Sequence, residues 1–334
     1  MKKVLLLFGG REEAEISKIS AKYIYHILMS NPKTDLYCVS VDSNNRLNFF
    51  DLDKNTQQTE ALLTREGLST NNQSIKIDFC IPCIHGYPGE SGDIQSMLEL
   101  LSIPYMGNNA ETSRLCFNKI TTKLWLEKLG IDTTPFEIIS PVCSPDQIKS
   151  IFKSFNQDVF IKSSSQGSSI GCYPANNIET YNQSISLARR YCPQILVEKK
   201  IKAREIEVAV FEYQNKIIVT NPGEVINGEN FYSYDDKYSS ESNAKTTLSP
   251  ILENSIKDKI KKLSRIAFET LNLKDLSRID FFLSEDGKIY LNEINTFPGL
   301  TEISLFPKLL QTEGITFNDY LVDRIYKPES DIDK

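Results

Sequence analysis

The chain has 334 residues, and its 38 lysines and arginines against 44 aspartates and glutamates give a formal net charge of −6. This length favours two or three domains, and a mildly acidic chain without a basic block argues against a nucleic-acid partner. No apolar run approaches the ~20 residues of a membrane-spanning helix. Seven scattered cysteines fit reduced thiols, so we expect a cytoplasmic protein without a membrane partner.

The first third of the chain alternates between strand-like and helical patterns. Such alternation indicates an α/β domain with an open parallel sheet, which we place at residues 1–107. The predicted strands are 3–8, 36–41 and 79–84, and the predicted helices are 94–101 and one that buries Ile16, Ile19, Tyr23 and Ile27.

Two glycine-containing turns follow strands of this predicted sheet. Gly9-Gly10 comes after the first strand and His85-Gly86 after the third. Ligands of open α/β sheets bind beyond the carboxyl ends of the strands, so we expect both turns at a ligand site. A nicotinamide site is not expected, because the G-x-G-x-x-G fingerprint is absent. Cys80 and Cys83 fall within an apolar run, and we interpret them as buried strand residues rather than zinc ligands.

From about Asn108 the pattern changes to that of an α+β module, which we place at 108–198. The rest of the chain, 199–334, is interpreted as a third domain. Within it, residues 221–250 have no clear periodicity, and so long a stretch favours a lid or a binding loop. The other predicted elements of these two parts are helices at 111–129 and 251–271 and strands at 136–140, 159–162, 195–199, 205–211 and 216–220.

A β-hairpin predicted between Arg278 and Pro298 carries Asp280, Glu293 and Asn295. Glu293 and Asn295 are two residues apart, so they share one side of a strand, and Asp280 on the neighbouring strand can converge with them. Three oxygen ligands without His or Cys suit a hard cation such as Mg²⁺ that is bound together with phosphate oxygens. The simpler alternative is a hairpin with a polar outer face.

Two other segments have the composition of a nucleotide site. The serine- and glycine-rich loop at 162–171 offers backbone N–H groups, hydroxyls and the Lys162 ammonium to an anion, and the alternative is a flexible hairpin. The charged end of the strand at 195–199 offers backbone groups to an adenine edge, while Glu205 can reach ribose hydroxyls. The alternative for this segment is a solvated strand end.

These segments and several others resemble the D-alanine–D-alanine ligases, a family of the ATP-grasp superfamily, over nearly the whole chain. The shared motifs are long and follow one another in the same order, so chance is a poor explanation. They are Gly9–Ser17, His85–Gln95, Pro104–Gly107, Asn118-Lys119, the loop at 162–171, Tyr232–Tyr238 and Arg278–Leu305.

The resemblance implies a three-domain ATP-grasp architecture with ATP held between the central and C-terminal domains. It further implies ATP-dependent ligation of two D-alanines through a D-alanyl phosphate, as a step of peptidoglycan synthesis. Two Mg²⁺ (or Mn²⁺) ions per site and a homodimer belong to the same expectation. The alternatives are D-alanine–D-lactate or D-alanine–D-serine ligation and, in a different class, a catalytically silent nucleotide-binding protein.

The resemblance also implies roles for individual residues. The catalytic group comprises Glu13 for the ammonium of the first D-alanine, Ser168 and Tyr238 linked to it, and Arg278 with the N–H of Gly299 as the oxyanion site. The substrate-binding group is His85, Lys237, Ser304 and Leu305. The ATP-binding group is Lys119, Lys162, Glu198, Lys199, Ile201 and Glu205, and the metal ligands are Asp280, Glu293 and Asn295.

Some positions depart from the family pattern. None of the departures removes a metal ligand, a phosphate-binding lysine or the oxyanion arginine of the implied site. We therefore expect them to affect loop closure and rate more than the reaction itself. They are Ala14, Asn118, Ser163, Gln166, Ala203 and Asp235-Asp236.

Overall fold

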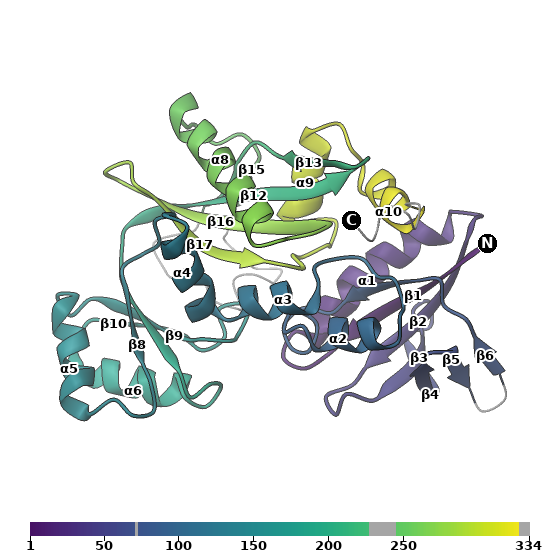
Figure 1. Cartoon of the computed structure of the whole chain (residues 1–334), viewed down its shortest axis with the longest axis horizontal. Coiled ribbons are helices and arrows are strands. Elements are labelled where there is room, and N and C mark those ends of the chain that lie inside the picture. The colour runs from purple at the N-terminus through teal and green to yellow at the C-terminus, as the bar shows by residue number, and fades with distance from the viewer. Residues whose placement is uncertain (71–72, 227–244, 327–334) are drawn as a thin grey trace.

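The computed structural model of the protein describes residues 1–70, 73–226 and 245–326. Three sheets flanked by helices make up the architecture of these residues (Figure 1). Among the helices described, none combines the length and the apolar character that crossing a bilayer requires.

The N-terminal sheet has seven strands in the order β6-β5-β4-β3-β2-β1-β7. Only β1 with β2 and β1 with β7 pair in parallel, and the other pairs are antiparallel. The expected parallel sheet therefore holds for three strands. The strands from β3 to β6 were not predicted, because β4 is mostly exposed and β3, β5 and β6 have only five, four and three residues. The bounds are β1 Lys2–Gly9, β2 Thr34–Val41, β3 Leu47–Asp51, β4 Thr56–Thr64, β5 Gly67–Thr70, β6 Gln73–Ile75 and β7 Phe79–Cys83.

Helix α1 (Ala14–Met29) buries Ile16 and packs Tyr23 and Ile27 against the core as predicted, but Ile19 does not belong to its buried face. Ile19 is 53% exposed, whereas Ser17 and Ser20 are fully buried beside Ile24. The physical reason is that both hydroxyls bind His85, so polar residues occupy part of the buried stripe. Helix α2 (Asp93–Leu100) agrees with the prediction.

The middle of the chain forms an antiparallel sheet in the order β10-β9-β11-β8. The predicted helix 111–129 is broken at Asn118, which has an extended backbone and caps the second helix by accepting from the N–H groups of Ile120 and Thr121. The bounds are α3 Ala110–Phe117, α4 Lys119–Lys128, β8 Phe136–Ile139, α5 Pro145–Ser154, β9 Val159–Ser163, β10 Cys172–Ala175, α6 Ile178–Ala188 and β11 Ile195–Lys199.

Helices α5 and α6 cover this sheet and were not predicted (Figure 1). A signal for α5 was present in the sequence. Ser144 and Gln147 form a reciprocal capping box around Pro145, the first residue of the helix, which is a common pattern at helix starts.

The C-terminal sheet has the order β15-β14-β12-β16-β17, and β13 pairs with β12. Strands β14 and β15 fall in the stretch 221–250 that was predicted to lack periodicity, and the rest of the expected lid, 227–244, lies outside the described residues. The bounds are β12 Ala203–Tyr213, β13 Lys216–Val219, β14 Gly223–Ile226, β15 Lys245–Thr247, α8 Asn254–Thr270, β16 Leu276–Ser284, β17 Ile289–Asn295, α9 Leu305–Thr312 and α10 Phe317–Tyr326.

One hydrophobic core joins the N-terminal and C-terminal sheets. It includes Phe8 from β1, Phe297 after β17, and Phe306 and Tyr320 from α9 and α10. The rings of Tyr23 on α1 and Phe317 on α10 stack with their centroids 5.7 Å apart. Aromatic burial of this kind fixes the carboxyl edge of the first sheet against the end of the β16–β17 hairpin.

Candidate active site

The two glycine turns predicted to lie at one sheet edge do lie together. Gly9 pairs with Val41, and Phe8 pairs with Cys83, so β1, β2 and β7 end at the same level. A side chain on Gly10 would come within 2.9 Å of the carbonyl of Tyr87. The turns after β1 and β7 are therefore in direct contact, and both border the polar residues described next.

His85 connects this edge to the C-terminal part of the chain. Its Nδ1 lies 3.2 Å from the carbonyl oxygen of Phe297, and its Nε2 lies 2.9 Å from the hydroxyl of Ser20. A carbonyl can only accept, so Nδ1 carries the proton and Nε2 accepts from Ser20. Burial lowers the pKa of His85 to about 4, and the nearby Arg278 acts in the same direction. The imidazole is thus neutral at pH 7.

Glu13 is buried at the start of α1, where the hydroxyl of Ser168 donates to its Oε2. A side chain at Gly86 would approach Glu13 Oε1 to 2.8 Å, and one at Gly167 would approach it to 2.6 Å. A side chain at either position would displace the Glu13 carboxylate, so this group is enclosed by Gly86 from one segment and by Gly167 and Ser168 from another. This enclosure suits recognition of a small cation.

Glu90 adds a second carboxylate beside Glu13. Its Oε2 accepts from the N–H of Gly86 at 2.8 Å. Burial, followed by the negative charge of Glu13, raises the pKa of Glu90 to about 8. The pair therefore carries less than its full negative charge at neutral pH until a cation arrives.

Arg278 lies at the centre of the C-terminal sheet. Its Nε and Nη2 bind the two carboxylate oxygens of Asp280 at 2.8 and 2.7 Å. Its Nε also lies 2.9 Å from Glu207 on β12. Although burial opposes it, the attraction of Asp280 and Glu207 raises the pKa of Arg278. Among the described residues Nη1 has no hydrogen-bond partner, so this nitrogen is the one available to a reacting oxygen.

The three predicted metal ligands lie on adjacent strands. Asp280 and Glu293 are directly opposite each other in the β16–β17 register, and Asn295 Nδ2 donates to Asp280 Oδ2 at 2.9 Å. Since Nδ2 is so used, Oδ1 is the atom of Asn295 that can bind a metal. Two carboxylates and an amide oxygen fit a hard cation. Within the described ranges, no larger group of His, Cys, Asp or Glu is arranged to hold a metal.

Lys119 connects this cluster to the serine- and glycine-rich loop. As the first residue of α4, it donates its backbone N–H to Ser164 O at 2.7 Å and its Nζ to Gln166 O at 2.5 Å. Its Nζ lies 3.6 Å from Glu293. The break at Asn118 makes this approach possible. The two departures from the family pattern are compatible with it, because Asn118 caps α4 and Gln166 contributes only its backbone carbonyl.

Lys162 and Glu198 form an ion pair at 2.5 Å in the middle sheet. Burial alone would raise the pKa of Glu198, but Lys123 and Lys162 together lower it to about 2. Although burial opposes it, the pull of Glu198 raises the pKa of Lys162. Both groups are therefore charged at neutral pH.

The remaining predicted ATP-binding residues lie at the link between the middle and C-terminal sheets. The backbone N–H of Lys199 donates to Pro135 O at 2.9 Å, so that group is already used. Ile201 lies in the link, half-buried, and Glu205 lies on β12 opposite Val225 and Phe282. Glu198 and Lys199 are consecutive on β11, so this link continues directly from the Lys162–Glu198 ion pair.

Gly299 and Ser304 lie together at the start of α9. A side chain on Gly299 would approach Ser304 Oγ to 3.0 Å, and that hydroxyl lies 2.7 Å from Thr301 Oγ1. Leu305, the first residue of α9, directs its backbone N–H at the helix start, where unpaired N–H groups favour an anion. Lys237, Tyr238 and Asp235-Asp236 lie outside the described residues.

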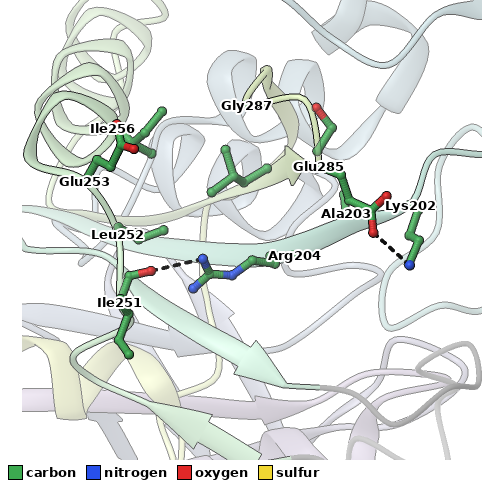
Figure 2. A pocket seen from close by; sticks show the side chains of 11 residues that line it. Lys202, Ala203, Arg204, Ile251, Leu252, Glu253, Ile256, Glu285 and Gly287 are labelled. Carbon is green, nitrogen blue, oxygen red and sulfur yellow. Dashed lines mark hydrogen bonds and ion pairs between the residues drawn. The ribbon is translucent and has the colours of Figure 1, made fainter.

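A pocket of about 440 Å³ lies elsewhere, where the start of β12, the end of β16 and the segment before α8 meet (Figure 2). Its lining includes Lys202, Arg204 and Glu285, with Lys202 paired to Glu285 at 2.7 Å and Arg204 bound to the carbonyl of Ile251 at 3.0 Å. None of the predicted site residues lines it. It is therefore separate from the polar cluster described above.

Several residues of this cluster have no role that was predicted from the sequence. Two of them could have been found from the sequence. Glu90 lies within the motif His85–Gln95, and Glu207 is two residues from Glu205, so it lies on the same face of the same strand. Ser20 and Lys123 had no such signal, because a serine and a lysine in a helix are ordinary until the tertiary contact is known.

Three helix-flanked sheets with lysines and carboxylates gathered between them define an α/β protein of the ATP-grasp class. A family model described as the N-terminus of D-ala D-ala ligase matches residues 3–108, and one described as its C-terminus matches residues 125–327. The chain belongs to the D-alanine–D-alanine ligase family.

Individual relatives agree with this assignment. The chain is 45% identical over 322 residues to a D-alanine–D-alanine ligase of Tolumonas auensis, covering 95% of this chain and 96% of the relative. It is 41% identical to the solved D-alanyl-alanine synthetase A of Vibrio cholerae, with a TM-score of 0.88 and 97% of each chain covered. The VanG D-Ala:D-Ser ligase of Enterococcus faecalis shares the fold, with a TM-score of 0.84 at 23% identity and 97% and 98% of the two chains covered.

Proposed function

We propose that this protein joins two D-alanines into D-alanyl-D-alanine at the expense of ATP, as a step of peptidoglycan synthesis in the cytoplasm. The observation that carries the proposal is the position of the Arg278 guanidinium. It is bound by Glu207 and by Asp280, which is also one of the predicted metal ligands. A fixed, buried positive charge at this point suits an oxyanion that forms next to phosphate oxygens.

The reaction has two steps. A carboxylate oxygen of the first D-alanine attacks the γ-phosphorus of ATP, and ADP leaves, which gives D-alanyl phosphate. The amine of the second D-alanine then loses a proton and attacks the carbonyl carbon, and phosphate leaves as the peptide bond forms. No enzyme nucleophile is needed, so the protein contributes positioning and charge stabilisation.

The chain's residues divide between the two substrates. Glu13, enclosed by Gly86 and Gly167, takes the ammonium of the first D-alanine, and neutral His85 lies near its carboxylate. Ser304 and the Leu305 N–H at the start of α9, with Lys237, take the carboxylate of the second. Arg278 Nη1 and the Gly299 N–H stabilise the tetrahedral oxyanion.

The nucleotide belongs between the middle and C-terminal sheets. Lys119 and Lys162 bind its phosphates, and Glu198, Glu205 and the backbone from Lys199 to Ile201 bind adenosine. Mg²⁺ or Mn²⁺ would be held by the oxygen donors Asp280, Glu293 and Asn295, and when bound such ions neutralise charge on the transferred phosphoryl group.

Three further features belong to the proposal. A lid over residues 221–250, with Tyr238 linked to Ser168 and Glu13, would keep water from the acyl phosphate, and residues 227–244 of it lie outside the described residues. The domains are 1–107, 108–198 and 199–334, and the protein is a homodimer.

D-lactate and D-serine are the competing second substrates, because the shared fold with a D-Ala:D-Ser ligase does not determine this choice.

An isotope experiment tests the chemistry. D-alanine labelled with ¹⁸O in its carboxylate is incubated with the full chain, ATP and Mg²⁺, and the released phosphate is analysed by mass spectrometry. One labelled oxygen per phosphate is expected, because a carboxylate oxygen of the first D-alanine stays on phosphorus. Unlabelled phosphate formed with the dipeptide would contradict the acyl phosphate route.

A further inference from the structure

Lys123 on α4 is almost completely buried, with 1% of its side chain exposed. Lysines are rarely buried to this degree unless their charge is paired, because removing an ammonium group from water is costly. Burial lowers the pKa of Lys123, although Glu198 acts in the opposite direction. The roles proposed above do not use this lysine, so its burial needs a reason.

The ammonium group of Lys123 lies among polar groups of β11 and the Thr134 segment. Its Nζ lies 2.7 Å from Glu198 Oε1 on β11 and 2.8 Å from the hydroxyl of Thr134. The carbonyl of Thr134 is 3.4 Å away, and the ring of Phe136 lies below it with its centroid at 5.3 Å. Thr134 accepts hydrogen bonds from the ammonium through its hydroxyl and its carbonyl, and Glu198 forms an ion pair with it. With 1% of its side chain exposed, Lys123 does not present this ammonium to a substrate.

Glu198 is shared between two lysines. Its Oε1 faces Lys123 and its Oε2 faces Lys162, whose Nζ also lies 3.4 Å from Asn292 Oδ1 on β17. The side chain of Lys162 is 12% exposed, whereas those of Glu198 and Lys123 are 3% and 1% exposed. The three groups together carry one net positive charge, and only Lys162 can present it to a ligand.

We infer that Lys123 is a positioning residue for the nucleotide phosphates, because it neutralises Glu198 permanently and so leaves the charge of Lys162 uncompensated. This inference rests on the proposed role of Lys162 in phosphate binding. Without Lys123, the carboxylate of Glu198 would cancel the charge of Lys162. The phosphate site would then keep its shape but lose its attraction for an anion.

The alternative is that Lys123 only holds α4 against β11 and the Thr134 segment. That role predicts lower stability and equal effects on all ligands. The inference instead predicts a loss that depends on phosphate, because adenosine lacks the group that Lys162 attracts. Comparing ADP with adenosine therefore separates the two roles.

The test uses the full chain with Lys123→Met, which keeps the apolar stem and removes the charge. Titration calorimetry with ADP and competition by adenosine give the two affinities, and steady-state kinetics gives KM for ATP and for D-alanine. We expect ADP affinity and KM for ATP to worsen about tenfold or more, as loss of one charge contact implies. KM for D-alanine stays within about threefold, and adenosine, which meets Glu198 but offers no phosphate to Lys162, loses clearly less affinity than ADP.

Two further variants control for folding. Thr134→Val removes one acceptor of Lys123 but no charge, so ADP affinity is expected to change little. The double variant Lys123→Met with Glu198→Gln removes both buried charges and restores the net charge of Lys162. Its ADP affinity is expected to exceed that of Lys123→Met. If Lys123→Met does not fold, the double variant is compared with the native chain, and its ratio of ADP affinity to adenosine affinity is expected to stay within about threefold of the native ratio.

The outcomes separate this inference from the proposed function. If Lys162→Met leaves ADP affinity unchanged, the proposed nucleotide site fails and the inference with it. If Lys162→Met weakens ADP but Lys123→Met does not, or weakens adenosine equally, the inference alone is overturned. A double variant that binds ADP no better than Lys123→Met would also overturn it.

Discussion

The Nδ1–H of His85 donates to the carbonyl of Phe297, 212 residues further along the chain, with the two atoms 3.2 Å apart. His85 follows β7 of the N-terminal sheet, and Phe297 follows β17 of the C-terminal sheet. The bond therefore holds together the two halves of the proposed D-alanine site. Because the imidazole is buried, the fold requires its neutral form, in which Nε2 accepts from Ser20.

This requirement makes stability depend on pH. The pKa of His85 falls from 6.5 to about 4 on folding, chiefly through burial. A lowered pKa contributes stability above pH 6.5 that is lost as the pH falls towards 4, because the unfolded chain takes up the proton first. Between pH 7 and 5 this loss is about 2 kcal/mol. Urea denaturation should show a smaller loss in His85→Gln, while His26→Gln, at an exposed histidine, should behave like the native chain.

Replacing Arg278 should slow the chemistry while nucleotide binding is maintained. Arg278→Ala is expected to lower kcat on the order of 100- to 1,000-fold, as loss of an oxyanion donor does. Arg278→Lys keeps the charge but loses the two-point contact with Asp280, so a large loss is expected there too. ADP affinity should change less than about threefold. Arg265→Ala, at an exposed ion pair on α8, is the matched control. A native kcat in Arg278→Ala would remove Arg278 from the oxyanion role.

Ser168→Ala removes the hydroxyl that donates to Glu13. Loss of a hydrogen bond to a charged group costs about 1.5–3 kcal/mol, so KM for the first D-alanine should rise roughly tenfold or more. KM for ATP should stay near its native value. Ser186→Ala, at an exposed serine of α6, serves as control. An equal rise in both KM values would indicate a general distortion of the loop instead.

Glu90 should destabilise the ligand-free protein as the pH rises. Burial and Glu13 raise its pKa from 4.5 to about 8. Because the pKa is raised, the contribution of Glu90 to the free energy of unfolding is fully present below pH 4.5. It is lost as the pH rises through 8, because the carboxyl group ionises first in the unfolded chain. Glu90→Gln cannot ionise, so its advantage over the native chain should grow from pH 5 to pH 8.5 in urea denaturation. Glu111→Gln, at an exposed residue of α3, should show no such trend, and a constant difference for Glu90→Gln would refute the coupling.

Glu293→Gln should weaken the dependence on divalent metal. The variant keeps one oxygen donor opposite Asp280 but loses a negative charge. The Mg²⁺ concentration for half-maximal rate is expected to rise about tenfold. Glu285→Gln, an exposed residue beside the turn of the same hairpin, is the control. An unchanged Mg²⁺ titration in Glu293→Gln would move the metal site elsewhere.

The local patterns in the sequence predicted the parts of the site that lie close together along the chain. The two-residue spacing of Glu293 and Asn295 and the hairpin that brings Asp280 opposite them agree with the observed register. The carboxyl-edge position of Gly9-Gly10 and His85-Gly86 is also confirmed. The roles proposed for these residues stay predictions.

Features that depend on contacts distant in sequence were not predicted. Ser17 and Ser20 belong to the buried face of α1 only because His85 is there, and Asn118 breaks a helix where Lys119 must reach Ser164. The antiparallel strands from β3 to β6 were missed because β4 is mostly exposed and the other three are too short to show an alternating pattern. Lys123 could not be distinguished from a solvent-exposed helix lysine without its partner Glu198.

The central claim is tested most directly by phosphate release from ATP and Mg²⁺, measured together with dipeptide formation. The full chain is supplied with no amino acid, D-alanine, L-alanine, D-alanine with D-lactate, or D-alanine with D-serine. We predict release with D-alanine alone, equal to the D-alanyl-D-alanine formed, and none with L-alanine. Release that requires D-lactate or D-serine, or silence in every mixture although ADP binds, would contradict the account.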